Sequence, residues 1–93
     1  MKIKISLTLN RHEEIEVKEL SCKVEDVVYC KRDKEYCAYD FATGLKIGSA
    51  LKVSELINLV NSRLEDIKTC RANPDYSKEI INKKENLFTL GDI

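Results

Sequence analysis

Residues 27–41, VVYCKRDKEYCAYDF, contain the pattern that decides the fold. Two runs rich in valine, tyrosine and small apolar residues flank the charged segment 32–35, as in two strands joined by a tight loop. A four-residue loop there places Cys30 opposite Cys37, whereas a three-residue loop would shift the register and separate the two cysteines. In the first register, one buried face is expected to consist of Val28, Cys30, Cys37, Tyr39 and Phe41.

The next turn, at residues 42–44 (ATG), extends this hairpin into a meander. A three-residue loop with glycine in the left-handed conformation is a favoured connection between antiparallel strands. It places Leu45 opposite Phe41. It also places Ile47 opposite Tyr39, so that both residues are expected to join the same buried face.

The first nine residues alternate between polar and apolar side chains, which is the period of a half-buried strand. With a loop at residues 10–12, a second strand returns along the first and Leu7 lies opposite Ile15. In the same register Ile5 lies opposite Val17, so both strands bury the same face.

The apolar period then changes twice. The apolar residues first move from odd-numbered to even-numbered positions, at Leu20, Cys22 and Val24. A bulge or a turn near residues 19–21 would explain this change. From residue 53 the apolar period becomes the spacing of an amphipathic helix that reaches residue 70. The apolar stripe of this helix consists of Val53, Leu56, Ile57, Val60, Leu64 and Ile67, with Cys70 one step further.

The C-terminal part of the chain predicts a second, short helix. Asn73 is a suitable N-cap and Pro74 suits the first helical position, so this helix is expected to continue to about Lys84. The tail at residues 87–90 (LFTL) is apolar enough to dock on the sheet as an edge strand or as a cover.

These patterns together predict one α+β domain over residues 1–93. Its core, 1–71, is an antiparallel meander of four to five strands packed on one face by a long amphipathic helix. Residues 72–93 supply the short C-terminal helix and a tail that docks on this core.

Composition excludes several classes of protein. Sixteen basic and sixteen acidic residues give a net charge of zero, which argues against a nucleic-acid coat or a binder of anionic membranes. No apolar run approaches the roughly 18 residues of a membrane span. The alternating N-terminus is unlike a signal peptide, so a cytoplasmic protein is expected.

The four cysteines do not predict a metal site. Cys22, Cys30, Cys37 and Cys70 include no close C-x2–4-C pair, and His12 is the single histidine. Without an export signal a disulfide framework is not expected either. The cysteines are interpreted as small buried hydrophobes, with no metal and no cofactor.

The sequence also offers little for catalysis. It contains no glycine-rich phosphate loop, and Gly44 and Gly48 are interpreted as turn glycines. His12, the one candidate base, is expected in an exposed polar loop. The chain is therefore expected not to be an enzyme.

The remaining candidates for a functional site are residues on the surface. The sheet face opposite the predicted core carries tyrosines among cations, and such residues suit either a protein contact or the stacking of unpaired bases. Alternatively, the C-terminal segment covers this face. The candidate partner-binding residues there are Tyr29, Lys31, Tyr36 and Lys46.

A second candidate surface is acidic. Residues 11–26 contain six acidic and three basic side chains, a local net charge of −3. Glu14 and Glu16 on the second strand are therefore candidates to engage a basic site on another protein. Alternatively, charges of this kind simply face the solvent or prevent an edge strand from pairing with a strand of another chain.

The leading hypothesis is a small non-catalytic module that binds a host or cellular protein complex. Twelve lysines against four arginines, nine isoleucines and six asparagines suggest AT-rich codons. That composition fits an accessory protein of a phage or mobile element that inhibits a host enzyme or a defence complex, such as a CRISPR effector. One alternative is a sequence-tolerant binder of RNA or single-stranded DNA, and another is a structural or regulatory homodimer subunit. Under the leading hypothesis, the protein is a monomer or a homodimer and does not associate with a membrane.

Overall fold

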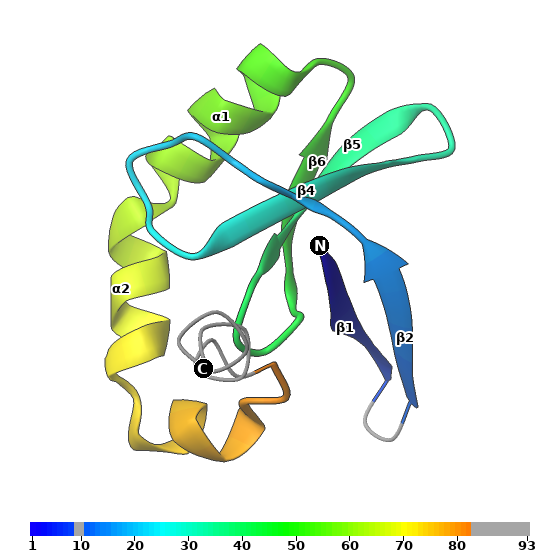
Figure 1. Cartoon of the computed structure of the whole chain (residues 1–93). Coiled ribbons are helices and arrows are strands. Elements are labelled where there is room, and N and C mark those ends of the chain that lie inside the picture. The colour runs from blue at the N-terminus through cyan, green and yellow to red at the C-terminus, as the bar shows by residue number, and fades with distance from the viewer. Residues whose placement is uncertain (9–10, 83–93) are drawn as a thin grey trace, which may run out of the picture.

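The computed structural model describes residues 1–8 and 11–82. Two antiparallel sheets and two α-helices are arranged in layers (Figure 1). The strands are β1 (Lys2–Thr8), β2 (Arg11–Glu16), β3 (Lys18–Glu19), β4 (Val27–Arg32), β5 (Glu35–Asp40) and β6 (Lys46–Ala50). The helices are α1 (Val53–Ser62), α2 (Leu64–Ala72) and the 3-10 helix η1 (Pro74–Glu79).

The hairpin of β4 and β5 has the predicted register. Cys30 lies opposite Cys37, and Arg32 lies opposite Glu35, so that only Asp33 and Lys34 form the turn. Asp33 has a φ of 56°, the left-handed conformation that a tight hairpin requires of one of its central residues. The predicted face is confirmed as well, because Val28, Cys37, Tyr39 and Phe41 are buried in one cluster and Cys30 packs against it.

The second turn confirms the conformation of its glycine, and the predicted register holds from Tyr36 to Ala38, which lies opposite Gly48. Gly44 has a φ of 69°, as expected. However, the ladder between β5 and β6 is irregular between Ala38 and Tyr39, and Tyr39 lies opposite Lys46. Because a shift of one residue exchanges the faces of a strand, the placement of Ile47 beside Tyr39 is wrong. Ile47 packs on the opposite side of the sheet.

The position of Leu45 also differs from the predicted one. Leu45 was expected in the buried face opposite Phe41, but it is 46% exposed in the loop that precedes β6. The strand β5 ends at Asp40, whose N–H donates to the Leu45 carbonyl at 2.9 Å, so Phe41 already belongs to the loop.

The hairpin of β1 and β2 also differs in register. Ile3 lies opposite Ile15 and Ile5 lies opposite Glu13, so the predicted pairs of Ile15 with Leu7 and of Ile5 with Val17 are wrong. Arg11 and His12 belong to β2, which removes them from the predicted loop. The displacement is four residues, an even number, and the predicted apolar face of both strands is therefore preserved: Ile3, Ile5 and Val17 are buried.

Val17 is the point at which the chain passes from one sheet to the other. Its N–H donates to the Met1 carbonyl at 2.7 Å, beside β1, and the next two residues form β3 beside β4. Val17 is buried with the β1–β2 hairpin, whereas Leu20 and Val24 are buried on the helix side. The change in the apolar pattern thus comes from this crossing at Val17, and not from the predicted bulge or turn near residues 19–21.

The β3–β4–β5–β6 sheet is covered on both faces. One core lies between this sheet and the β1–β2 hairpin, and it is formed by Ile3, Ile5, Val17, Val28, Cys37, Tyr39 and Phe41. The other lies between the sheet and the helices, and it is formed by Leu20, Val24, Val27, Ala38, Leu56 and Val60. The predicted packing of one face only is therefore wrong: the face predicted for the helix holds the hairpin, and the helix takes the other.

The long helix is divided in two. Its predicted apolar stripe is confirmed, because Leu56 and Val60 are fully buried. At Arg63 the backbone leaves the helical region, with φ −102° and ψ 12°, and α2 begins at the next residue. The Arg63 guanidinium donates to the Ile47 carbonyl on β6, an interaction that a residue at this junction can reach. Cys70, expected to extend the stripe, is exposed.

The short C-terminal helix begins as predicted. The Asn73 side chain accepts a hydrogen bond from the Asp75 N–H at 2.9 Å, and Pro74 occupies the first helical position. The helix is of the 3-10 type and ends at Glu79, not near Lys84. The predicted docking of the tail at residues 87–90 lies outside the described residues.

Substituting Val60 tests the helix face. We expect Val60→Asp to lower the free energy of unfolding by at least about 4 kcal/mol, because it buries a carboxylate without a partner. Asn58→Asp, at an exposed position of the same helix, is the control and should melt within a few degrees of the wild type. A Val60→Asp protein with a wild-type thermal transition would contradict this packing.

The register of β4 and β5 has a chemical consequence. Directly opposed residues on antiparallel strands have Cα atoms about 4.5–5.5 Å apart, within the range of a disulfide. Mild oxidation with diamide should therefore link Cys30 to Cys37 within one chain, as read by mass spectrometry of the proteolysed protein. Burial and the neighbouring Cys37 raise the pKa of the Cys30 thiol, so the rate should increase from pH 7 to pH 9. Oxidation confined to the exposed Cys70 would contradict the register.

Candidate functional site

The tyrosines predicted as a contact patch lie together on the helix side of the sheet. Cross-strand pairing forms two adjacent rows, Lys18–Tyr29–Ala38 and Lys31–Tyr36–Ala50. The rings of Tyr29 and Tyr36 are diagonal neighbours, with centroids 6.3 Å apart and planes inclined at 52°. The Lys31 ammonium lies 5.6 Å from the centre of the Tyr36 ring, in cation–π geometry.

This tyrosine surface, defined as Lys18, Tyr29, Lys31 and Tyr36, is partly open. The helix α1 packs mainly over β5 and β6, so the two tyrosines on this side are half-buried at its margin. Both lysines are exposed. The expectation of a fully exposed face is therefore corrected to a half-exposed one, and the alternative in which residues 87–90 cover it falls outside the described part of the chain.

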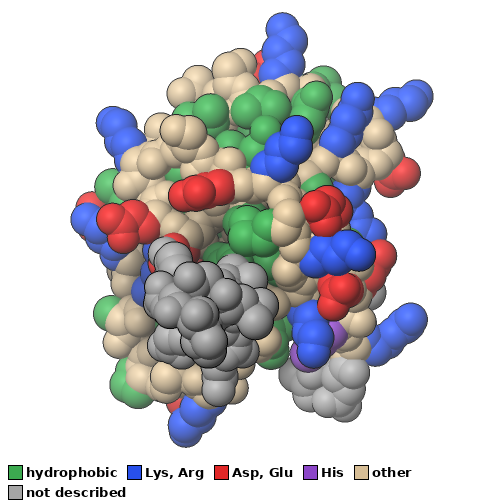
Figure 2. Space-filling model, in the orientation of Figure 1, with side chains coloured by type: hydrophobic (Ala, Val, Ile, Leu, Met, Phe, Trp, Pro, Cys, Tyr) green, Lys and Arg blue, Asp and Glu red, His purple; other side chains and the backbone are tan. Residues whose placement is uncertain are grey.

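One large apolar side chain is exposed just after the end of β6. Tyr36 lies opposite Ala50, and the next residue, Leu51, is 66% exposed in the connection to α1. Figure 2 shows apolar side chains between cationic ones over the upper part of the molecule, where Figure 1 places α1 and the β4–β5 hairpin.

The charges of the tyrosine surface have one sign. Lys18 and Lys31 belong to its two rows, whereas the acidic neighbours Glu19 and Glu35 lie opposite Val28 and Arg32. Because successive side chains of a strand point to opposite faces, these two carboxylates project away from the tyrosines.

The other predicted contact residues lie elsewhere. Lys46 was expected near the tyrosines, but it lies opposite Tyr39, on the face of the sheet that carries the β1–β2 hairpin. Glu14 and Glu16 are exposed on β2. Glu16 forms an ion pair with the N-terminal ammonium at 2.9 Å, and this hydrogen bond holds the pKa of Glu16 below its usual value.

His12 also differs from its prediction. It lies on β2 opposite Ser6 and not in a loop, although its side chain is exposed as expected. Neighbouring Glu13 forms an ion pair with Arg32 at 3.2 Å, which ties the hairpin of β1 and β2 to the end of β4.

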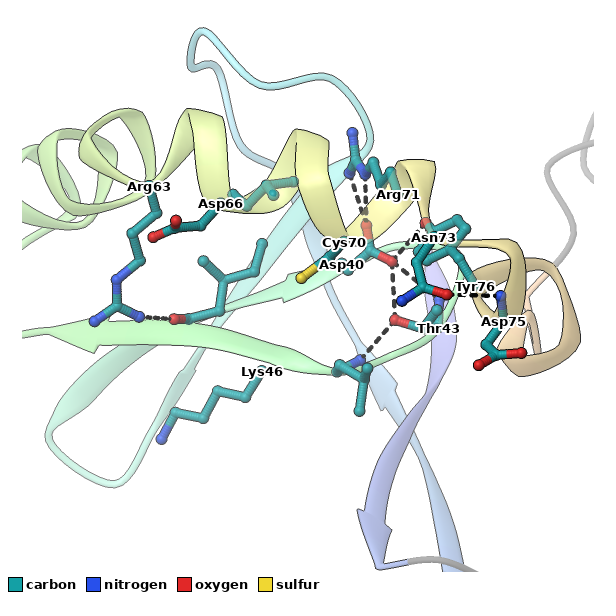
Figure 3. Close-up of a pocket in the computed structure, with 13 residues that line it drawn as sticks. Asp40, Thr43, Lys46, Arg63, Asp66, Cys70, Arg71, Asn73, Asp75 and Tyr76 are labelled. Atoms are coloured by element: carbon teal, nitrogen blue, oxygen red, sulfur yellow. Dashed lines mark hydrogen bonds and ion pairs between the residues drawn. The ribbon is translucent and has the colours of Figure 1, made fainter.

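Sequence reasoning missed a buried polar network centred on Asp40. One carboxylate oxygen accepts two hydrogen bonds from the Arg71 guanidinium, at 2.7 and 3.2 Å. The other accepts from the Thr43 hydroxyl and from the Tyr76 hydroxyl, each at 2.8 Å. Figure 3 shows these side chains converging on Asp40 from the β5–β6 loop, α2 and η1. Asp40 is a single charge within the apolar run 36–41, which was the available signal.

The electrostatics of the network fit a structural clamp. Burial alone would lower the pKa of Arg71, but its hydrogen bonds and charge pairing with Asp40 outweigh that effect and raise it. Burial and the hydrogen bond to Asp40 raise the pKa of Tyr76 to about 12. Both oxygens of Asp40 are engaged by neighbours, so this carboxylate is held in position and is not poised as a base.

A hollow of about 460 Å³ adjoins this clamp (Figure 3). Its apolar wall includes Leu45, Ile47 and Ile67, and Asp40 and Tyr76 line its other end. The polar groups of this end are bound to one another and do not converge on the open space. The geometry at this end of the hollow is therefore that of a structural clamp.

Two further properties concern the described part of the chain. Within residues 1–8 and 11–82, no three histidine, cysteine or carboxylate side chains are gathered in a way that would hold a metal ion. Among the helices of the same residues, none has the length and apolar character needed to cross a membrane.

Comparison of the chain with models of protein families, with curated proteins and with solved structures found no match. Functional inference therefore rests on the surface and the contacts of the chain itself.

The clamp predicts a dependence of stability on alkaline pH. Because the pKa of Tyr76 is raised from about 10 to about 12, its contribution to stability is complete below pH 10 and is lost as the pH rises to 12. Tyr76 is partly solvated, so the wild type should lose only about 1 kcal/mol more than Tyr76→Phe over this range. Urea unfolding at pH 7, 10 and 12 measures the difference, and parallel pH profiles of the two proteins would contradict the hydrogen bond to Asp40.

Proposed function

We propose that this chain is a non-catalytic protein-binding domain that acts by occupying the surface of a larger protein. The observation that carries the proposal is the half-exposed tyrosine pair with Lys31 held over the Tyr36 ring. Tyrosine contributes a large contact area with few rotatable bonds and a polar end, and it is enriched among the residues that dominate binding energy.

The composition supports a biological setting for this activity. A lysine-, isoleucine- and asparagine-rich chain of 93 residues fits an accessory protein of a phage or mobile element in an AT-rich host. In that setting the partner is a host enzyme or a defence complex in the cytoplasm, for example a CRISPR effector. The domain inhibits it by covering a working surface.

A second candidate is the binding of RNA or single-stranded DNA. The neighbouring rings of Tyr29 and Tyr36 offer faces on which bases can stack, with Lys31 beside them. A net charge of zero weighs against it, because the affinity of such proteins depends on many phosphate contacts.

A comparison of variants tests the proposal. The immobilised chain should retain a protein from an AT-rich bacterial lysate after nuclease treatment, and Tyr36→Ala should retain at least about tenfold less of it. Lys46→Gln, on the other face of the sheet, is the control and should retain the wild-type amount.

Thermal melting of each variant shows that it is folded. Equal retention of the partner by folded Tyr36→Ala would contradict the proposal. Loss of the partner on nuclease treatment would also contradict it and would instead favour binding of nucleic acid.

A further inference from the structure

We propose that the partner presents an extended acidic segment to the tyrosine surface, with two carboxylates on the same side of its chain. This inference rests on the proposed protein-binding function and adds the chemistry of the partner. It is carried by the placement of Lys18 and Lys31 around the tyrosine pair.

The first argument is charge complementarity. Both lysines are exposed, and both lie in the rows that contain Tyr29 and Tyr36. Glu19 and Glu35, which directly adjoin Lys18 and Tyr36 in the sequence, fall on the other side of their strands. An approaching segment therefore meets positive charge and aromatic rings together, and electrostatic complementarity selects an acidic one.

The second argument is spacing. Lys18 lies opposite Tyr29, and Lys31 is two residues further along the same strand as Tyr29, so the two lysines are diagonal neighbours. Diagonal neighbours in an antiparallel pair are about 7–8 Å apart. Alternate residues of an extended chain are separated by about 6.6 Å and point to the same side. Carboxylates at positions i and i+2 of an extended segment thus match the two ammonium groups.

The third argument is preorganisation. The Lys31 ammonium already lies over the Tyr36 ring, which restricts its side chain before binding. Ordering a free lysine side chain at an interface costs conformational entropy, and a side chain that is already restricted loses less. Tyrosine hydroxyls can also donate to a carboxylate, so the rings beside the lysines suit an acidic segment as well as an apolar one.

An acidic peptide fits these residues better than a nucleic acid does. Proteins that bind single strands without sequence preference combine stacking with a positively charged groove that follows about 4–16 nucleotides. Here two lysines flank two rings in a chain of zero net charge.

Fluorescence anisotropy with defined probes tests the inference. The first probe is a fluorescein-labelled ten-residue peptide in which glutamate alternates with threonine. The second replaces each glutamate with glutamine, and the third is a ten-nucleotide oligo-dT. We expect the glutamate peptide to bind at least tenfold more tightly than the other two and to weaken between 50 and 200 mM salt.

Variants locate the binding. Lys18→Gln combined with Lys31→Gln should weaken binding of the glutamate peptide by at least about fivefold, as expected for two partly exposed ion pairs. Lys46→Gln is the matched control and should leave the affinity unchanged. Equal binding of the glutamate and glutamine peptides, tighter binding of oligo-dT, or an equal loss in Lys46→Gln would overturn the inference.

Retention of the lysate protein by the variants distinguishes a failure of this inference from a failure of the protein-binding function on which it rests. If that protein is lost with Tyr36→Ala but retained by the double lysine variant, the acidic partner is wrong and the protein-binding function stands. If Tyr36→Ala changes nothing, the protein-binding function itself fails. Loss with both variants supports the function and the acidic partner together.

Discussion

The structure depends on the burial of strand β5 from both sides. Cys37 and Tyr39 face the β1–β2 hairpin, whereas Ala38 between them faces the helices and is fully buried. A strand with two buried faces must be apolar at successive positions. The β1–β2 hairpin and α1 are placed by the face of β5 that each of them covers.

The buried part of this strand carries one charged side chain. Asp40 follows directly on the two-sided apolar run and is 7% exposed, so its carboxylate requires partners. Arg71 and Tyr76 provide them from α2 and η1, and Thr43 provides a third from the loop. The cost of burying Asp40 is offset by these hydrogen bonds, and the same bonds tie the C-terminal helices to the sheet.

The tyrosine surface follows from this arrangement. Because α1 lies over β5 and β6, the rings on the margin beside β4 are left half-covered. The two tyrosines therefore have one side packed against the core and one side available, which positions them firmly for contact. The clamp at Asp40 lies near the other end of β5 and leaves this margin open.

The sequence by itself determined which residues alternate and therefore share a face. It predicted the pairing of Cys30 with Cys37, the left-handed Gly44, the apolar stripe of α1 and the N-cap at Asn73, because each depends on near neighbours in the chain. It also placed Tyr29, Lys31 and Tyr36 on one face, three of the four residues of the tyrosine surface.

Tertiary structure decided what covers each face. The bulge beside Ala38, the division of the helix at Arg63 and the side on which α1 packs depend on contacts between distant segments, for which alternation carries no signal. The joining of Lys18 to the tyrosines needed the crossing of the chain at Val17, and the displacement of Lys46 to the opposite face needed the bulge. The alternation of apolar and polar residues shows which side chains share a face of a strand. Which layer covers each face is decided only by the packing of the layers against one another.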